Sequence, residues 1–452
     1  MTTILSLFII ITGLLVYVIK PNWLFFYWIS LYPVFFPIFC LASLIFDRET
    51  FLACQNMVSD AGRNLFFFII LLEYIKNRKF PFIGRTFHVL ALLSLYILIQ
   101  GLILHPDVIS IWPELSALLS LILPLILMLM RPDMLPNPTS LFKFMGVLLL
   151  IQVIGALLNI NGIHTYLTFY IPYDYLLDNG ELYSGEEGLA MGTFPSPVFL
   201  SNFCTTLFLF VSLEYFSDKI IFRKQYFVVA IVIVFLVIVS GIRVSIVLYF
   251  LILWLCCLLY IKKHSVMLIS ITLIGLISYI LLLSIDIKNL DSGEENAGIL
   301  RQISGLAKAV QASETTETGT TGLTVYLIDN YFGRSPIIGN GLSYKGQYAY
   351  GNFRTVALTN FKADARLAFI LVEYGIIGAF LFLLYFFSIL LFLNTKVAKY
   401  EKKKLFICFC YYFILTIVDP GFFDRLNFPL MFLYALCVLD RNLVTNIGGK
   451  RI

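Results

Sequence analysis

Long runs of apolar residues, separated by short polar stretches, fill most of this 452-residue chain. A helix that crosses a bilayer needs about 20 predominantly apolar residues. The runs that come near this length are 3–19, 23–46, 58–75, 86–104, 112–130, 141–161, 197–216, 226–241, 244–261, 265–285, 367–393, 405–418 and 427–439. An open chain in lipid must satisfy its backbone hydrogen bonds within itself, so each run is predicted to be a helix. The pattern predicts an all-α polytopic membrane protein with about 12–14 transmembrane helices.

The composition supports this prediction. Hydrophobic residues make up 60% of the chain, charged residues make up 13%, and the mean hydropathy is +0.90. A soluble domain has about 45–50% apolar and about 25% charged residues. An ordinary soluble enzyme, a disordered chain and a nucleic-acid binder are therefore excluded. The run 3–19 has no basic flank and no cleavage site, so we expect it to be a retained span rather than a signal peptide.

Basic residues in short loops set the expected orientation, because such loops stay in the cytoplasm. They cluster at 76–85, 131, 219–224, 262–263, 396–404 and 441–451. Alternating spans place all these clusters on the cytoplasmic side of the membrane, together with the C-terminus. The N-terminus is then external, or internal if either 3–19 or 23–46 is re-entrant.

Two long segments then face outward. In the region 1–285, the loop at 161–196 carries five acids and no lysine or arginine. The second segment, 286–366, is one large external loop, and 367–452 holds the last spans and the cytoplasmic C-terminus. Within the large loop we expect an amphipathic helix at 298–312, a linker at 313–322, a short helix at 324–332 and irregular structure at 333–351. Long loops are usually functional or disordered, so we expect the chemistry to be external.

Charged residues lie at the expected external ends of spans in three places, and the first two are Arg243 and the pair Asp364 and Arg366. Arg243 lies between two very apolar spans, where it is either a snorkelling anchor or a ligand for a lipid-linked phosphate. Asp364 and Arg366 begin the span at 367. A carboxylate suits a helix start, but a cation there opposes the helix dipole. Glu373 follows inside the span, and we expect it to pair with another helix rather than to act as a catalyst.

The remaining candidates are weaker one by one. Arg425 lies in the turn 419–425, which is either a solvated turn with a local ion pair or part of the site. Arg301, Arg334 and Arg354 lie in the large loop, where each alone would be a surface charge. Together with Arg243, Arg366 and Arg425 they give six arginines on one face, which could stabilise a departing pyrophosphate.

No known motif for a nucleotide or a zinc ion is present. The chain has no P-loop, no GxGxxG on a strand–helix unit and no HExxH. Its four histidines are scattered, and its eight cysteines show no metal-ligand spacing. We therefore expect no cofactor and no metal, and interpret the cysteines as small hydrophobic residues.

The sequence resembles the bacterial O-antigen polymerase and O-antigen ligase family over roughly 190–390. Residues 240–245 resemble its serine–arginine segment, 329–341 its "hPllGxG" segment, and 364–378 its "E-x-G-hh-G" exit from the large loop. Residues 192–197 (GTFPSP) also resemble a segment of the polymerases. The order and spacing of these segments agree with the family.

The resemblance implies a helical glycosyltransferase of the GT-C type in the bacterial cytoplasmic (inner) membrane, acting on the periplasmic face. Donor and acceptor would be undecaprenyl-diphosphate-linked glycans, with a chain-length regulator and a flippase as candidate partners and no nucleic acid. Ligases carry a histidine where the large loop meets the next span. Asp364 stands near that place here, which favours a polymerase. Polymerases often carry an arginine shortly before the GTFPSP-like segment, where this chain has Glu186 and Glu187.

We therefore expect an inverting, metal-independent polymerase of O-antigen, capsule or exopolysaccharide repeat units. Arg243 would bind the diphosphate, with Arg366 and either Arg334 or Arg301 assisting. The candidate base is Asp364 or Glu187, because inversion needs a proton acceptor near the attacking hydroxyl. Two further candidate substrate contacts, besides Arg425, are Arg354 and Tyr344.

Two alternatives stay open. One is a ligase that transfers the glycan to lipid A core. The other is a lipid-linked oligosaccharide flippase or transporter. Transporters tend to carry internal repeats, broken helices and charges at the middle of the membrane. This chain instead concentrates its polar residues in one external loop, which favours the enzyme.

Overall fold

A computed structural model shows the chain as a set of helices with no strand among the residues that it describes. One isolated antiparallel bridge joins Val397 to Leu439. The described residues are 2–31, 34, 48–78, 81, 84–104, 122–134, 138–160, 190, 192–194, 197–217, 223–240, 243–260, 335–339, 366–399, 401–418, 434–436 and 438–439.

Most helices lie on the predicted apolar runs, but the helix at 48–77 begins ten residues before its run, 58–75. In chain order they are α1 (Thr2–Ile19), α2 (Leu24–Ser30), α4 (Arg48–Asn77), α5 (Arg85–Leu104), α7 (Pro138–Ile160), α9 (Pro197–Phe216), α10 (Arg223–Ser240), α11 (Arg243–Tyr260), α17 (Arg366–Asn394) and α18 (Lys402–Val418). Short 3-10 turns, η1 and η4, cover Pro21–Trp23 and Pro132–Met134, and residues 122–130 are also helical. Proline is the first residue of α7 and of α9, a position where its missing N–H costs nothing.

Among the described residues, four helical segments are long and apolar enough to cross a membrane. They are Arg85–Leu104, Thr139–Asn159, Phe199–Phe216 and Glu373–Asn394. Shorter apolar helices cover Ser6–Ile19, Tyr226–Ser240 and Leu248–Tyr260. The described part of the chain thus has the character of an α-helical membrane protein. The predicted helices at 298–312 and 324–332 and the span at 265–285 lie outside the described residues.

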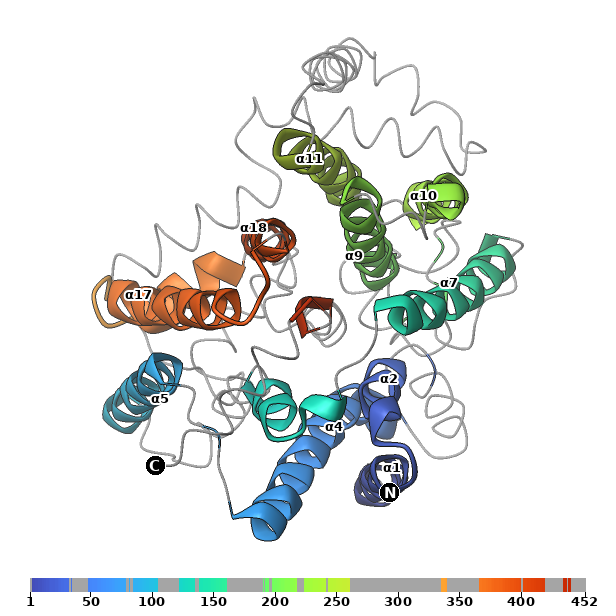
Figure 1. Cartoon of the computed structure of the whole chain (residues 1–452). Helices are drawn as coiled ribbons and strands as arrows, with labels where there is room; N and C mark the ends of the chain where they lie inside the picture. Colours follow the sequence, from blue (N-terminus) through green and yellow to red (C-terminus); the bar gives the residue numbers. More distant parts are fainter. Residues whose placement is uncertain are drawn as a thin grey trace.

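Helix α9 lies at the centre of one group of helices and contacts α7, α10 and α11 (Figure 1). Its apolar span is 83% buried, whereas that of α5 is only 28% buried. A second group pairs α5 with α17, and a third pairs α1 with α4 (Figure 1). Tyr411 of α18 bonds the Thr205 hydroxyl of α9, and α18 also packs on α17, so α18 connects two of the groups.

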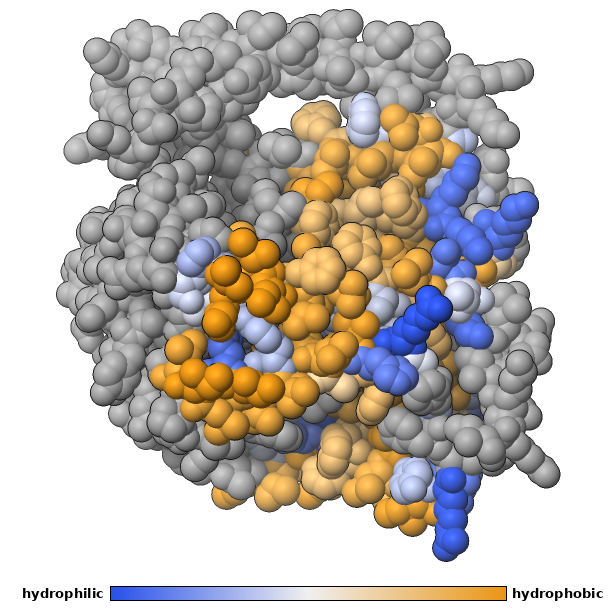
Figure 2. Space-filling model, turned by 90° about the vertical axis from the view of Figure 1, so that its left-hand side faces the viewer, coloured by the Kyte–Doolittle hydropathy of each residue, from blue (hydrophilic) through white to orange (hydrophobic). Residues whose placement is uncertain are grey.

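The outer helices expose apolar side chains. Phe227 is 62% exposed and Ile231, one turn further along α10, is 68% exposed. Figure 2 shows a largely apolar described surface, with hydrophilic side chains gathered toward one side. Large apolar patches on a folded surface mark contact with lipid or with another protein. Here the exposed apolar side chains lie along apolar helices, several of them long enough to span a membrane, so lipid is their natural environment.

The described cysteines are free thiols. Cys204, Cys256, Cys257 and Cys408 are buried, and Cys410 is half-buried. They occupy apolar helix positions, which agrees with their interpretation as small hydrophobic residues.

Candidate functional site

Two of the predicted site residues begin helices. Arg243 is the first residue of α11 and Arg366 is the first residue of α17, and the structure describes their backbone. The other predicted residues lie outside the described part of the chain. They are Glu187, Arg301, Arg334, Tyr344, Arg354, Asp364 and Arg425. The described residues around these positions form two crossings in which a loop segment meets a helix through glycines.

The first crossing joins the segment Ser335–Gly339 to α17, where that helix is broken. Gly375 has φ of 66° and ψ of −171°, which interrupts the helix, and Gly339 has φ of 84°. The N–H groups of Ile376 and Ile377 donate to the carbonyls of Pro336 (2.9 Å) and Ile337 (3.2 Å). In an unbroken helix they would donate to carbonyls four residues earlier in the same helix. The loop segment therefore replaces the helical hydrogen bonds that the break removes.

The two glycines leave no room for side chains. A Cβ atom on Gly339 would lie 2.3 Å from the Glu373 carbonyl oxygen, and one on Gly375 would lie 2.4 Å from the Ile337 carbonyl oxygen. Both backbones also have positive φ, which favours glycine. This explains the glycines of two family-like segments, 329–341 and 364–378, which meet here.

Helix α5 holds this crossing from the side. The Gln100 amide nitrogen donates to the carbonyls of Ile338 (2.5 Å) and Glu373 (2.8 Å). The Tyr96 hydroxyl lies 2.7 Å from the carbonyls of both Ile338 and Tyr374. Each side chain thus contacts the loop segment and the helix together. Glu373 is buried, and its backbone carbonyl accepts a hydrogen bond from α5. The backbone carbonyl of Tyr374 also lies within hydrogen-bond distance of α5.

The second crossing joins residues 192–194 to α7. Gly192 has φ of 63° and packs on Gly155, where a Cβ would lie 2.8 Å from the Gly192 carbonyl carbon. The Gln152 amide oxygen accepts from the Thr193 N–H (2.8 Å), and its nitrogen donates to the Thr193 hydroxyl (2.6 Å). The Asn159 amide oxygen accepts from the Gly192 N–H (3.0 Å).

This second crossing lies beside the end of α10. The Ala190 N–H donates to the Val239 carbonyl at 2.8 Å. Val239 precedes Arg243 by four residues, a span of at most about 14 Å of extended chain. The segments 192–197 and 240–245 are therefore neighbours. Each of the four segments that resemble the family thus lies at one of the two crossings or next to it.

Both crossings lie at the same end of the helices. Gly192 precedes α9, and Glu214 near the far end of α9 pairs with Lys404, near the start of α18. Gly375 is near the start of α17, whose far end leads to α18. We call the end that holds Gly155, Gly192, Gly339 and Gly375 the glycine end. The 20 residues of α9 separate it by about 30 Å from the opposite end.

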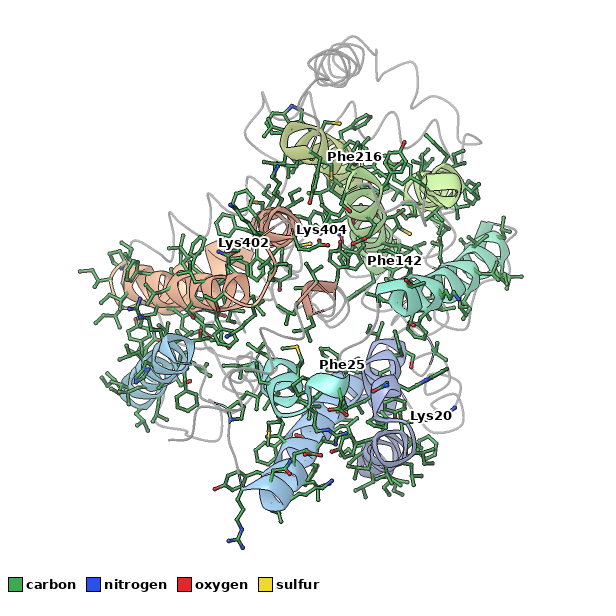
Figure 3. All side chains as sticks on the ribbon, viewed as in Figure 1. Lys20, Phe25, Phe142, Phe216, Lys402 and Lys404 are labelled. Atoms are coloured by element: carbon green, nitrogen blue, oxygen red, sulfur yellow. The ribbon has the colours of Figure 1, made fainter. Side chains whose placement is uncertain are left out.

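The opposite end holds buried ion pairs, and we call it the ionic end. Lys404 Nζ lies 2.8 Å from Glu214 and 2.7 Å from Glu401, and the Tyr434 hydroxyl donates to the same Glu214 oxygen (2.7 Å). Lys404 and Glu214 are each 1% exposed. Lys404 lies between α18 and α9 (Figure 3).

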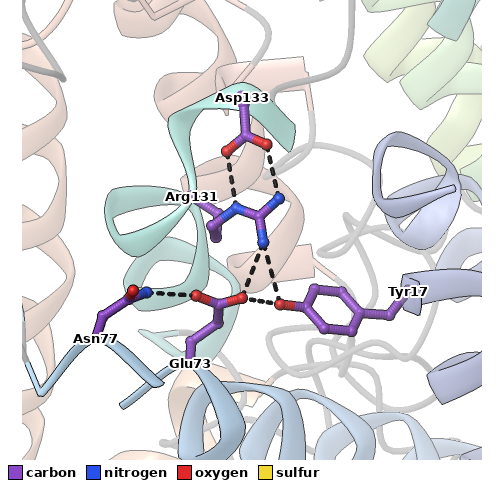
Figure 4. Close-up of polar contacts among 5 residues, drawn as sticks. All are labelled: Tyr17, Glu73, Asn77, Arg131 and Asp133. Carbon is purple, nitrogen blue, oxygen red and sulfur yellow. Dashed lines mark hydrogen bonds and ion pairs between the residues drawn. The ribbon is translucent and has the colours of Figure 1, made fainter. Parts of the chain in front are cut away.

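A second buried carboxylate, Glu73 of α4, joins three segments. It accepts from Tyr17 of α1, from Asn77 (2.7 Å) and from Arg131 (2.8 Å), as Figure 4 shows. Arg131 also forms a two-pronged ion pair with Asp133. The hydrogen bonds to the Asp133 carboxylate raise the pKa of the Arg131 guanidinium above its usual value. Helix α7 begins a few residues later in the chain, at Pro138, and Phe142 near its start packs on the ring of Tyr434. This network thus belongs to the ionic end as well.

Sequence reasoning missed the amides that organise the glycine end. Gln100, Gln152 and Asn159 lie inside predicted apolar spans and are buried. A buried amide in an apolar helix must find hydrogen-bond partners, which was the available signal. Within the described residues, no group of three or more His, Cys, Asp or Glu side chains is arranged to hold a metal ion.

No protein-family model, curated protein or solved structure matches this chain.

Proposed function

We propose that this protein is a polysaccharide polymerase that extends an undecaprenyl-diphosphate-linked glycan at the outer face of the bacterial cytoplasmic membrane. The observation that carries the proposal is the crossing at Gly339 and Gly375. Two segments that resemble the O-antigen polymerase family, and that are distant in sequence, bond to each other there. Their glycines are required by that contact, and this supports the proposal.

The crossings also fix the backbone near the candidate phosphate ligands. Ser335 follows Arg334 directly, and Arg366 lies nine residues before Gly375, about 14 Å along a helix. At the second crossing, the bond from Ala190 to Val239 holds the end of α10 just before Arg243. Guanidinium groups bind phosphate oxygens in two-pronged geometry, and a fixed backbone reduces the entropy lost on binding.

In the proposed reaction, a hydroxyl oxygen of the acceptor repeat unit attacks the anomeric carbon of the donor chain. The bond from that carbon to the diphosphate oxygen breaks with inversion, and undecaprenyl diphosphate leaves. The hydroxyl proton passes to a carboxylate, for which Asp364 and Glu187 are the candidates. Arg243 stabilises the departing diphosphate, with Arg366 and either Arg334 or Arg301 assisting.

The test uses purified protein in proteoliposomes with lipid-linked repeat units as donor and acceptor. Removing one positioned donor to a developing negative charge typically lowers the rate about 10²–10³-fold. We expect this loss in Arg243→Ala and a smaller loss in Arg243→Lys, which keeps the charge but not the planar fork. Arg223→Ala is the matched control, because Arg223 begins α10 at the ionic end as Arg243 begins α11 at the glycine end. Unchanged chain extension by a folded Arg243→Ala protein would refute the assignment of Arg243.

Deletion of the gene separates the proposed activity from its alternatives. Loss of the polymerase leaves single repeat units on the lipid A core. Bare core with long lipid-linked chains left in the membrane would instead identify a ligase. Movement of labelled lipid-linked sugar across a proteoliposome without chain extension would identify a transporter.

A further inference from the structure

We propose that Gln100 and Tyr96 of α5 are positioning residues that set the direction of the first part of α17, and with it the place of Arg366. This inference rests on the proposed function for its link to chain extension. Its structural core, that α5 holds a broken helix to a docked loop segment, rests on the hydrogen bonds at the first crossing.

The break at Gly375 makes such support necessary. Residues 366–374 precede the break, and the N–H groups just after it, on Ile376 and Ile377, donate to the loop segment instead of to this part of the helix. Continuous helical hydrogen bonding therefore does not fix the direction of residues 366–374. Bonds from α5 to the carbonyls of Glu373 and Tyr374 supply that constraint.

The two side chains are not equivalent. Gln100 is 3% exposed, and its two amide hydrogens can serve Ile338 and Glu373 at the same time. Its amide oxygen has no hydrogen-bond partner among the described residues, so its contribution is that of a double donor. The Tyr96 hydroxyl has one hydrogen, which can serve only one of its two carbonyls at a time. We therefore expect a larger effect from Gln100 than from Tyr96.

The same pair of helices provides a matched control. Thr86, near the start of α5, is buried and donates to the Ser388 carbonyl of α17 at 3.1 Å. This bond joins the same helices far from the break. A general loss of packing between α5 and α17 would appear in Thr86→Val, whereas loss of the positioning function would not.

The first experiment measures amide hydrogen exchange at Ile376 and Ile377 in the full-length protein in nanodiscs. Loss of the two neutral hydrogen bonds by which Gln100 joins the loop segment to α17 should raise exchange about 10–30-fold in Gln100→Leu. We expect a smaller rise in Tyr96→Phe and no change in Thr86→Val. Unchanged exchange in both Gln100→Leu and Tyr96→Phe would overturn the inference. If Gln100→Leu does not fold, Tyr96→Phe alone decides this arm.

The second experiment is a double-mutant cycle on chain extension, normalised to folded protein. A residue that acts through Arg366 should lose its effect once Arg366 is removed. We expect Gln100→Leu or Tyr96→Phe to slow extension in the native background and to change it less than about twofold in Arg366→Ala. Three results would each overturn the link between α5 and Arg366. The losses in rate from the two substitutions could multiply in the double mutant, Thr86→Val could slow extension as much as Gln100→Leu, or Arg366→Ala could leave the rate unchanged. If the native protein extends no chain, the proposed function fails, and the exchange measurement still decides whether α5 holds the segment.

Discussion

The two ends of the helices are held together in different ways. At the ionic end, side chains from distant helices meet through charge: Lys404 lies between Glu214 and Glu401, and Arg131 reaches Glu73. At the glycine end, the contacts are made by backbone groups, neutral amides and hydroxyl groups. There Gly339 meets Gly375 and Gly192 meets Gly155, without room for a Cβ atom.

This difference agrees with what the proposed function would require of each end. Charged side chains on long flexible stems join helices while tolerating small shifts of the backbone. Backbone contacts between glycines tolerate almost none, so they fix the direction of the segments that leave them. The segments that resemble a glycosyltransferase family gather at the glycine end. A site that must hold reacting groups within a fraction of an ångström needs this kind of support.

The largest expected effect is at the first crossing. Gly375→Ala places a methyl group 2.4 Å from the Ile337 carbonyl oxygen at a backbone with positive φ. Overpacking and backbone strain should together lower the free energy of unfolding by more than about 4 kcal/mol, or prevent folding. The measurement is the thermal unfolding of detergent-solubilised protein, followed by size-exclusion chromatography.

Two other glycines separate the causes of this loss. Gly84 has φ of 56° with nothing within 4 Å of a built Cβ, so Gly84→Ala should cost only about 1–2 kcal/mol of strain. Gly146 lies within α7 in open space, and Gly146→Ala should stabilise by up to about 1 kcal/mol. Equal losses in Gly375→Ala and Gly84→Ala would show that the close contact contributes nothing.

The sequence predicts helix positions well because lipid imposes a simple rule. The predicted spans 86–104 and 197–216 lie within a residue of α5 and α9. Length and hydropathy are local properties, so they can be read from a single run of residues. The number of spans and the outward direction of the site stay predictions.

The sequence does not show which helices meet. Glu214 and Lys404 each lie at the edge of a predicted span, where a charge is ordinary, and only the packing of α9 against α18 pairs them. The glycines of 329–341 and 364–378 were visible as family-like motifs. Their crossing was not, because a positive φ and a contact between distant segments leave no local pattern. The amides of Gln100 and Gln152 were visible as polar residues in apolar helices, but their partners were not.

The ionic end should be most sensitive at Lys404. Lys404→Met leaves Glu214 and Glu401 buried without their shared cation, and breaking a buried pair costs about 3–5 kcal/mol. Lys402→Met is the matched control, since Lys402 is exposed on the same helix. Thermal unfolding should show a large loss for the first variant and almost none for the second. Similar losses in both would mean that net basic charge, rather than the buried pair, stabilises this end.

The smallest expected effect concerns the two carboxylates that share Arg131. Asp133 is 59% exposed, whereas Glu73 is 2% exposed. Asp133→Asn should therefore cost at most about 1 kcal/mol, even though its pair with Arg131 is two-pronged. Glu73→Gln should cost more, because the buried bonds from Tyr17 and Arg131 lose their charged acceptor.

Salt sharpens this last contrast. Raising the ionic strength from about 0.05 M to about 1 M screens exposed charges much more than buried ones. The destabilisation by Asp133→Asn should therefore shrink toward zero at high salt, while that by Glu73→Gln should persist. If salt removed both effects equally, Glu73 would be accessible to solvent. The ionic end would then be a set of surface pairs, and the contrast with the glycine end would be one of chemistry alone, without a difference in burial.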